Sequence, residues 1–227
     1  MHLKRRLLQW NYSLSSKSRQ RKFDLFWSLM KPAPGVSVLN LGASPPHLGQ
    51  ALTGGEDSLI EQPEQDPRWA GLKVVGCNVL FGDMSQYRRE HAGKGFHTIV
   101  ADGCRLPFPD KSFDIVFSNA VIEHVTPEQQ QLMAKEIARV GRSWFVTTPN
   151  FWYPIEMHHK VPFFQFLPRP AQGFVQRKWK TWPEGEPINL LTSRQLKKLI
   201  PGSRVFKLRI TFHPETLIAY RREASLN

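Results

Sequence analysis

The chain has 227 residues, 41% of them hydrophobic, and a formal net charge of +12. That length suits one domain with an elaboration, and no run of about 18 apolar residues predicts a membrane-spanning helix. The two cysteines are too few for a disulfide framework or a four-cysteine zinc site, so a reducing, cytoplasmic setting is the default. The basic residues 1–10 lack the long apolar segment of a secretory signal.

The charge is distributed unevenly along the chain. Residues 1–31, 32–159 and 160–227 carry net charges of +7, −4 and +9. The middle has the balance of an ordinary enzyme core, whereas the two basic ends are either solvated surfaces or sites for an anionic partner. Nucleic acid, anionic lipid and a phosphorylated substrate are such partners, and the lipid would place the protein peripherally at the inner membrane face.

Helical and extended patterns alternate along the chain. Phe23, Phe26, Trp27 and Met30 have the spacing of one helix face, and Pro32 ends that helix. The acidic segment 45–71 is broken by proline and glycine, with a short helix expected near 47–52. Apolar runs predict strands at 36–41, 72–77, 96–101, 113–118 and 143–148, and two closing strands at 205–211 and 216–220.

Two capping-box sequences predict further helices. Thr126 to Gln129 precedes a periodic apolar face, and Thr192 to Gln195 precedes a second, shorter one. Strands thus alternate with helical segments and a hairpin follows at the end. This order predicts a doubly wound, Rossmann-like α/β fold: a seven-stranded sheet with an antiparallel C-terminal edge strand and helices on both faces.

In such a sheet, ligands bind beyond the carboxyl ends of the parallel strands. The residues that follow these ends are therefore the first candidates for a binding site. They are Gly42, Ala43 and Ser44 after the first strand, Asn78 after the second, Asp102, Gly103 and Cys104 after the third, and Asn119 after the fourth.

Several segments carry a pattern that is specific in combination. They are Val38-Leu-Asn-Leu-Gly-Ala-Ser44, the Leu-Pro-Phe block from Asp102 to Val116, Glu123-His124-Val125, and Glu136 to Gly141. Together they resemble the class I S-adenosylmethionine-dependent methyltransferases, and more narrowly the bacterial methyltransferase type 11 group. Residues 148–159 resemble a T-P-N-x-x-x-P-I-E-x-H signature of a bacterial subgroup. The resemblance covers roughly residues 32–148 and 188–222 and implies S-adenosyl-L-methionine as the cofactor.

The resemblance also implies roles for the residues at the strand ends. Gly42 would let the backbone approach the amino-acid part of the cofactor, with Ala43 beside it and Asn40 orienting the turn. Asp102 would accept a hydrogen bond from the adenine amino group, with Gly103 and Cys104 packed nearby. Asn119 would lie beside the sulfonium.

Three positions depart from the family pattern. Asn40 replaces an acid, Ser44 replaces a second glycine, and Asn78 stands where an acid usually accepts from the ribose hydroxyls. A neutral acceptor contributes about 0.5–1.5 kcal/mol against about 1.5–3 kcal/mol for a charged one, which predicts weakened cofactor binding. Alternatively, Glu56 or Asp57 takes over the ribose, or Asn78 is not the ribose position.

Histidines supply the candidates for a general base. We predict His158, oriented by Glu156, in this role, and His124 at the mouth of the fourth strand as a second candidate or as a structural histidine. A metal site built from Glu156, His158 and His159 is a competing interpretation, but the sequence offers no further ligand cluster, so we predict no metal.

We divide the chain into four parts. These are a basic N-terminal arm and helix (1–31), a cofactor-binding core (32–148), a substrate lid insertion (149–191), and a C-terminal helix with the closing hairpin (192–227). The insertion is long, rich in proline and interleaves aromatic with basic residues. It suits an acceptor, and equally nucleobases or an anionic membrane surface.

The sequence therefore predicts an S-adenosylmethionine-dependent methyltransferase that acts, at oxygen, on a small-molecule, sugar or lipid-linked acceptor. One alternative is a non-catalytic binding protein with a degraded cofactor loop. Another is an RNA-modifying or RNA-binding protein, suggested by the basic ends.

Overall fold

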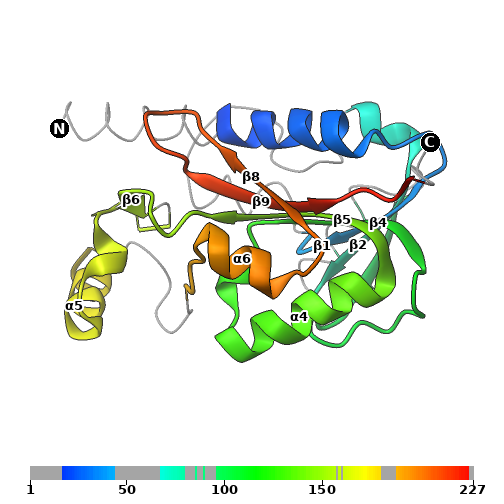
Figure 1. Cartoon of the computed structure of the whole chain (residues 1–227). Helices are drawn as coiled ribbons and strands as arrows, with labels where there is room; N and C mark the ends of the chain where they lie inside the picture. The colour runs from blue at the N-terminus through cyan, green and yellow to red at the C-terminus, as the bar shows by residue number, and fades with distance from the viewer. Residues whose placement is uncertain are drawn as a thin grey trace.

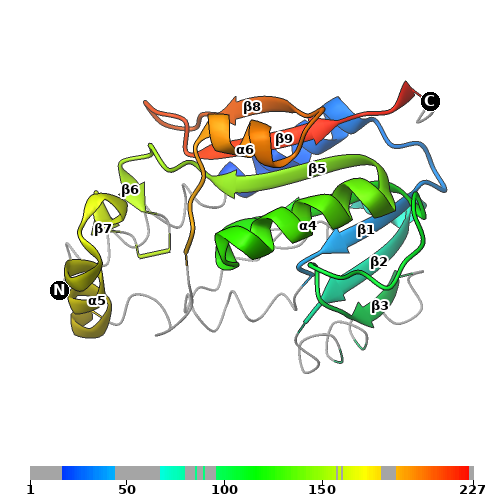
Figure 2. The same cartoon turned by 60° about the horizontal axis from the view of Figure 1, so that its bottom comes forward.

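The computed structural model describes residues 17–43, 67–79, 85, 89, 96–156, 158–159, 161–179 and 188–224. The helix expected near 47–52 lies outside these residues, as does Ser44. Among the described residues, seven strands form one sheet in the order β3-β2-β1-β4-β5-β9-β8 (Figures 1 and 2). The strands are β1 (Ser37–Leu41), β2 (Lys73–Asn78), β3 (Phe96–Val100), β4 (Phe113–Asn119), β5 (Gly141–Pro149), β8 (Arg204–Leu208) and β9 (Thr216–Arg221).

The sheet is parallel from β3 to β5, and the C-terminal strand β9 is antiparallel to both of its neighbours. The prediction of a doubly wound α/β sheet with an antiparallel C-terminal strand is confirmed. β9 enters between β5 and β8, so that β8 is the outermost strand. The strand order reverses between β1 and β4, and this switch point is where an open parallel sheet forms its ligand crevice.

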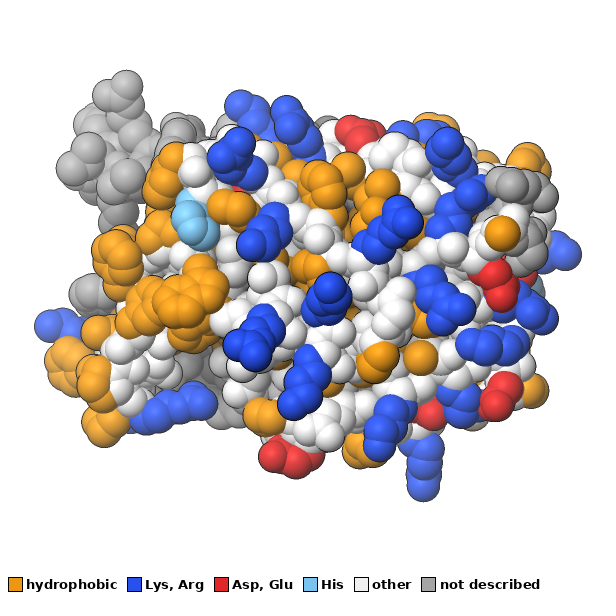
Figure 3. Space-filling model, in the orientation of Figure 1, with side chains coloured by type: hydrophobic (Ala, Val, Ile, Leu, Met, Phe, Trp, Pro, Cys, Tyr) orange, Lys and Arg blue, Asp and Glu red, His pale blue; other side chains and the backbone are white. Residues whose placement is uncertain are grey.

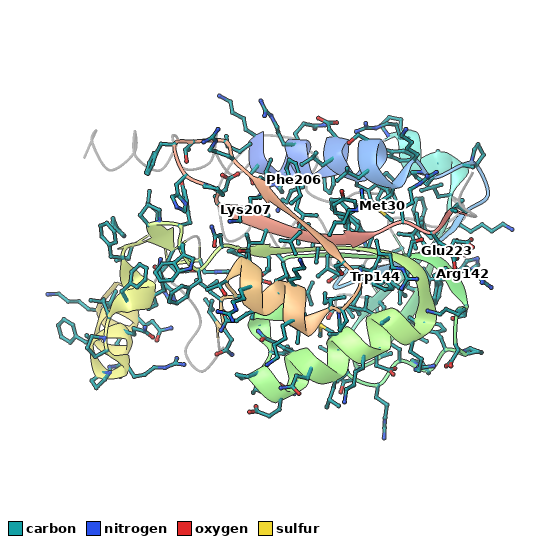
Figure 4. All side chains as sticks on the ribbon, in the orientation of Figure 1. Met30, Arg142, Trp144, Phe206, Lys207 and Glu223 are labelled. Carbon is teal, nitrogen blue, oxygen red and sulfur yellow. The ribbon has the colours of Figure 1, made fainter. Side chains whose placement is uncertain are left out.

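One face of the sheet is covered by the helix at residues 17–30. Phe23, Phe26 and Met30 are fully buried there against Phe117 and Phe145 of the sheet. Phe26 makes edge contacts with both sheet rings, at centroid separations of 5.3 and 5.5 Å. The predicted helix face is therefore the one that packs, and Figure 4 shows Met30 between this helix and the sheet.

The opposite face is covered by α4 (Pro127–Val140) and α6 (Ser193–Leu199), as Figure 1 shows. Both predicted capping boxes are present: the hydroxyls of Thr126 and Thr192 accept from the amides of Gln129 and Gln195. Trp144 of β5 lies on this side (Figure 4) and donates through Nε1 to Ser203 Oγ at 2.8 Å.

The insertion after β5 contains more regular structure than its sequence indicates. It holds a two-stranded ladder of β6 (Ile155–Glu156) and β7 (Val161–Pro162), a 3-10 turn η4 (Phe164–Phe166) and the helix α5 (Arg169–Trp179). No residue from 169 to 178 is fully buried. α5 therefore lacks the apolar stripe on which a sequence-based helix prediction depends.

The predicted first closing strand is too long at its end. β8 ends at Leu208, and the Ile210 amide donates to Glu215 Oε2 at 3.0 Å instead of extending the ladder. No helix among the described residues is long and apolar enough to cross a membrane.

Candidate functional site

The turn after β1 has no room for a side chain. Gly42 has φ +87°, and a Cβ at this position would collide with the side chain of Val121, just beyond β4. The amides of Gly42 and Ala43 both donate to Cys77 O, at 2.8 and 3.1 Å. The turn is thus folded over the end of β2 and pressed against the segment after β4, at the switch point of the sheet.

Asn78 is tied to the same turn. Its side-chain Nδ2 donates to Ala43 O at 2.8 Å. A carboxylate accepts hydrogen bonds but cannot donate one, so the acid of the family pattern could not make this contact. The amide of Asn78, in place of an acid, therefore makes a hydrogen bond that holds the turn. Asn40, the other amide, is 97% buried within β1.

The turn after β3 lies against the end of β1. A Cβ on Gly103 would stand 3.3 Å from Leu41 Cδ1 and 3.0 Å from Met133 Cε, so this position too is closely packed. Asp102 is exposed at the end of the strand, and its Oδ1 accepts from the Cys104 amide at 2.8 Å. The structure therefore places the β1 turn and the Asp102 turn, predicted from separate motifs, at one edge of the sheet.

The thiol of Cys104 is a packing group. Its Sγ donates to Gln129 O at 3.5 Å. Burial, with the nearby Asp102 carboxylate, raises the pKa of Cys104 to about 11, so the thiol is protonated near neutral pH. Leu106 and Phe108, which follow it, also belong to the hydrophobic core, and Phe108 packs edge-on against Phe113.

The end of β4 is braced by β5. Asn119 Oδ1 accepts from Thr147 Oγ1 at 2.8 Å. The next residue, Ala120, is left-handed with φ 55°, and its amide donates to Thr147 O at 3.1 Å. A left-handed residue with a side chain costs about 1–3 kcal/mol and persists where the surroundings hold it, often at functional sites.

A carboxylate and two histidine amides form a compact loop in the insertion. Glu156, 2% exposed, accepts through Oε1 from His158 Nδ1 at 2.8 Å. Its Oε2 accepts from the amides of His158 and His159, at 2.9 and 2.6 Å. Burial alone would raise the pKa of Glu156, but the bonds from His158 and these amides outweigh it and hold the pKa below its ordinary value. His159 is buried and stacks on Phe164.

His158 meets His124 across the sheet edge. Their rings are perpendicular, with centroids 4.9 Å apart. His124 ends the 3-10 turn η3 (Ile122–His124) that follows β4. Burial, with the neighbouring His158, lowers the pKa of His124 to about 4, so this ring is neutral at physiological pH. The structure thus brings together all three residues for which the sequence predicts a catalytic role.

Two charged residues join this cluster that the sequence analysis does not assign to the site. Glu123 is fully buried; its Oε2 accepts from Thr148 Oγ1 at 3.1 Å, and burial raises its pKa. Lys22, on the helix at residues 17–30, is 8% exposed, and burial together with Arg19 lowers its pKa to about 8. Glu123 belongs to the Glu-His-Val motif, and that motif was a signal for it. Lys22 is one of several basic residues at the start of its helix, and nothing in that pattern distinguishes it.

A cavity of about 500 Å³ opens between the insertion and α4. Such a volume is in the range of small-molecule sites. Glu156 is one of its lining residues, and Glu156 is the hydrogen-bond partner of His158. The lining residues are Pro127, Gln130, Phe151, Glu156, Phe164, Gln165, Leu167, Pro168, Arg169, Gln172, Ile188, Asn189, Leu190, Leu191 and Gln195.

The two ends of the insertion are joined to each other and to η3. The Phe151 amide donates to Leu191 O at 3.1 Å, and the Asn189 amide donates to Glu123 O at 2.7 Å. Asn189 Nδ2 also donates to Val125 O at 2.9 Å. The insertion is therefore anchored on the same turn that carries Glu123 and His124.

The outer surface of the insertion is aromatic and basic. Trp152, Phe163, Phe166 and Phe174 are each 45–59% exposed, and Lys178 lies over the Phe174 ring at 5.5 Å. Figure 3 shows apolar side chains gathered over the end of the molecule that carries β6 and α5, with Lys and Arg spread over the rest of this face.

Comparison with known proteins gives a family match for part of the chain. A family model described as a methyltransferase domain matches residues 64–143, the part of the chain that spans β2 to the start of β5. Over this segment the chain is similar to the methyltransferase domain, and its fold is that of the class I S-adenosylmethionine-dependent methyltransferases. The solved structures that it resembles share the fold at low identity, and several of them are described as methyltransferases. The finer subgroup suggested by residues 148–159 remains a prediction.

Two solved structures illustrate the fold that this chain shares with known proteins. An S-adenosylmethionine-dependent methyltransferase from Mesorhizobium loti is 13% identical with a TM-score of 0.60, over 88% of this chain and 96% of that one. A protein from Pyrococcus horikoshii OT3 is 16% identical with a TM-score of 0.57, over 91% of both chains.

A curated relative matches a shorter part of the chain. The human protein named probable tRNA methyltransferase 9B is 36% identical over 70 residues. That match covers 30% of this chain and 14% of the human protein's length.

Proposed function

We propose that this methyltransferase transfers the methyl group of S-adenosylmethionine to a hydroxyl oxygen of a small-molecule, sugar or lipid-linked acceptor held under the insertion. The observation that carries the proposal is the position of Glu156. This residue lines the cavity, and its carboxylate accepts from His158 Nδ1 at 2.8 Å.

The described residues at the sheet edge fit the cofactor. The turn at Gly42 admits no side chain, as a turn does where the backbone approaches a ligand closely. Asp102 presents an exposed carboxylate, held by the Cys104 amide, that suits the adenine amino group. Asn119, whose Oδ1 accepts from Thr147 Oγ1, is the residue that we propose beside the sulfonium. The role predicted for Ser44 falls outside the described residues and stays a prediction.

The protein's main contribution to methyl transfer is alignment. Bound S-adenosylmethionine supplies a methyl group already activated on a sulfonium. The acceptor oxygen's electron pair forms the new C–O bond while the C–S bond breaks, so the two partners must lie in line. Correct positioning of this kind contributes about 7–11 kcal/mol. The anchoring of the insertion on η3, through Asn189 and Glu123, provides that positioning here.

His158 is the proposed base for the hydroxyl proton. Because Glu156 accepts from Nδ1, the ring carries its proton there, and Nε2 is then the basic nitrogen. As the new C–O bond forms, the hydroxyl proton passes to Nε2 and the imidazolium is stabilised by the Glu156 carboxylate. His124, neutral and perpendicular to His158, walls the site without competing for the proton.

The walls of the cavity support the proposed acceptor class. Phe151, Phe164 and Leu167 provide apolar walls, and Gln130 and Arg169 add polar groups at the edges. Arg177 and Lys178 in the last turn of α5 add positive charge to the same part of the molecule. These features favour an acceptor with an apolar or sugar body and an anionic group, and residues 149–191 act as the lid that holds it.

Calorimetry with S-adenosylmethionine and S-adenosylhomocysteine tests the proposal first. We expect saturable binding of both, followed by transfer of a labelled methyl group to acidic glycans or lipid-linked sugars. Binding without transfer to any acceptor class would favour the non-catalytic alternative, and absence of binding would overturn the proposal.

RNA is a second candidate acceptor. The net charge of +9 on residues 160–227 and the local likeness to a protein named as a tRNA methyltransferase favour it. Neutralising several phosphates makes affinity fall steeply with salt. Labelled methyl transfer to tRNA, with such a salt dependence, would replace the sugar or lipid acceptor; salt-insensitive or undetectable binding would exclude RNA.

A further inference from the structure

The turn after β4 and the insertion place two imidazoles and a buried carboxylate together. Ligand atoms of Glu123, His124 and His158 all lie within 4.8 Å of one another. We infer that this cluster is a binding site for a divalent transition-metal ion of the zinc type, with Glu123, His124 and His158 as its three protein ligands. The metal site itself does not depend on the proposed function. Only the role of the bound ion in methyl transfer rests on that proposal.

The Glu123 carboxylate is the first reason. The residue is 0% exposed. Its Oε2 accepts from Thr148 Oγ1 at 3.1 Å, whereas Oε1 is buried with no hydrogen-bond partner among the residues that the structure describes. Leaving a carboxylate oxygen buried and unsatisfied is costly, and a bound cation removes that cost. Lys22 attracts Glu123 from the N-terminal helix but makes no hydrogen bond to Oε1.

The second reason is the orientation of His158. A metal-binding histidine almost always gives its other ring nitrogen to a carboxylate or carbonyl, which fixes the ring and raises its basicity. Glu156 does this for His158, through Nδ1 at 2.8 Å, and is itself fixed by the amides of His158 and His159. Nε2 is accordingly the ligand atom of His158.

The ligand set selects the ion. Two imidazoles and one carboxylate are the donors of catalytic zinc sites, which keep a fourth position for water or substrate. Magnesium and calcium prefer oxygen donors throughout, so they fit this set less well. Ligand atoms about 3.3 Å apart surround a tetrahedral ion at about 2.0–2.1 Å. The three atoms would therefore draw together by about 1.5 Å at most, which the partly exposed rings of His124 and His158 allow.

An ion here would change the role of His158. Glu156 borders the acceptor cavity, so the ion's fourth position would lie next to the bound acceptor. A metal ion in that position polarises and orients an acceptor oxygen. In the metal-bound protein His158 is then a ligand and positions the ion, rather than taking the hydroxyl proton itself.

Metal titration of the full chain tests the site. Protein stripped by chelation and dialysed is titrated with Zn²⁺ by calorimetry, and with Co²⁺ by visible absorption, which reports a tetrahedral donor set directly. We expect one equivalent to bind, with an affinity lost in Glu123→Gln and in His158→Ala. Glu156→Gln should weaken binding about 10–100-fold, the usual effect of removing a carboxylate that orients a ligand.

Control variants separate loss of the metal site from loss of the fold. His97→Ala, on an exposed position of β3, should bind the ion as the wild type does, and thermal unfolding shows whether each variant is folded. Absence of stoichiometric binding would overturn the metal site, as would binding that Glu123→Gln and His158→Ala leave unchanged in folded protein. If methyl transfer persists in metal-free protein, the ion has no part in the reaction and His158 acts as the base. If the protein binds the metal but not the cofactor, the proposed function is wrong and the metal site stands.

Discussion

Asn78 Nδ2 donates to Ala43 O at 2.8 Å, so the end of β2 holds the turn that follows β1. This bond connects a departure from the family pattern to the shape of the cofactor site. An acid at this position would gain charge toward a ribose but lose the hydrogen bond that fixes the turn.

We predict that Asn78→Asp weakens S-adenosylmethionine binding about 5–10-fold. The loss corresponds to one hydrogen bond, about 1 kcal/mol, because the new carboxylate faces the Ala43 carbonyl without a proton to share. Calorimetric titration at neutral pH measures it. Tighter binding by the variant would show instead that this residue acts on the cofactor through an acceptor oxygen.

Gly42→Ala should abolish cofactor binding and lower stability. The new Cβ would collide with Val121, and alanine at φ +87° adds strain of about 1–2 kcal/mol. Gly35→Ala is the matched control, because Gly35 has φ +85° but nothing within 4 Å of its Cβ position. Both variants carry the backbone strain, and only Gly42→Ala carries the collision. If Gly35→Ala and Gly42→Ala lost the same stability to chemical unfolding and the same cofactor affinity, the collision with Val121 would not be the cause.

His158→Ala should lower kcat about 100-fold or more while leaving the affinity for S-adenosylmethionine unchanged. The group acts on the acceptor, by proton transfer or through a bound ion, and general base catalysis alone contributes about 10²–10⁴-fold. Single-turnover methyl transfer separates this effect from binding. His97→Ala serves as the control. A loss of cofactor affinity in His158→Ala would show that His158 acts on the cofactor and not on the acceptor.

Stability should fall in acid through Glu136. Hydrogen bonds from the Arg139 side chain are the main cause that holds the pKa of Glu136 below its ordinary value, and the Leu106 amide adds a bond of 2.7 Å. A depressed pKa contributes stability above the unfolded value, about 4.3 for glutamate, and loses it as the pH falls through the folded value.

Glu136→Gln should therefore lower the urea midpoint at pH 7 and flatten its decline toward pH 3–4. Because Arg139 also donates to Leu106 O and Phe108 O, the loop that follows Asp102 should loosen with it. Urea unfolding across this pH range measures the effect. An unchanged acid dependence would mean that other carboxylates govern it.

Much of the fold could be predicted because its causes are local. The capping boxes at Thr126 and Thr192 place side chain and amide three residues apart, so the sequence contains both partners. Buried strands such as β4 read as continuous apolar runs because both faces are covered. The helix α5 was not predicted, because none of its residues from 169 to 178 is fully buried and no buried apolar face marks it.

The candidate site was predictable only in part. The motifs indicated His124, Glu156 and His158, and the adjacency of the last two suggested their hydrogen bond. Lys22 could not be assigned, because it reaches the cluster from a helix on another face of the sheet. Asn78 was interpreted through its missing charge, while its contact with Ala43 depends on how the turn folds.

The sequence by itself determined the strands and the capped helices, because these depend on neighbours within a few residues, and its short motifs indicated the class of fold. Only the tertiary structure decided that Glu123, His124 and His158 meet within 4.8 Å and that Glu123 is buried with one oxygen unsatisfied. The physical reason is that parallel strands bring their carboxyl ends to one edge, where residues far apart in the chain share a single low-dielectric site.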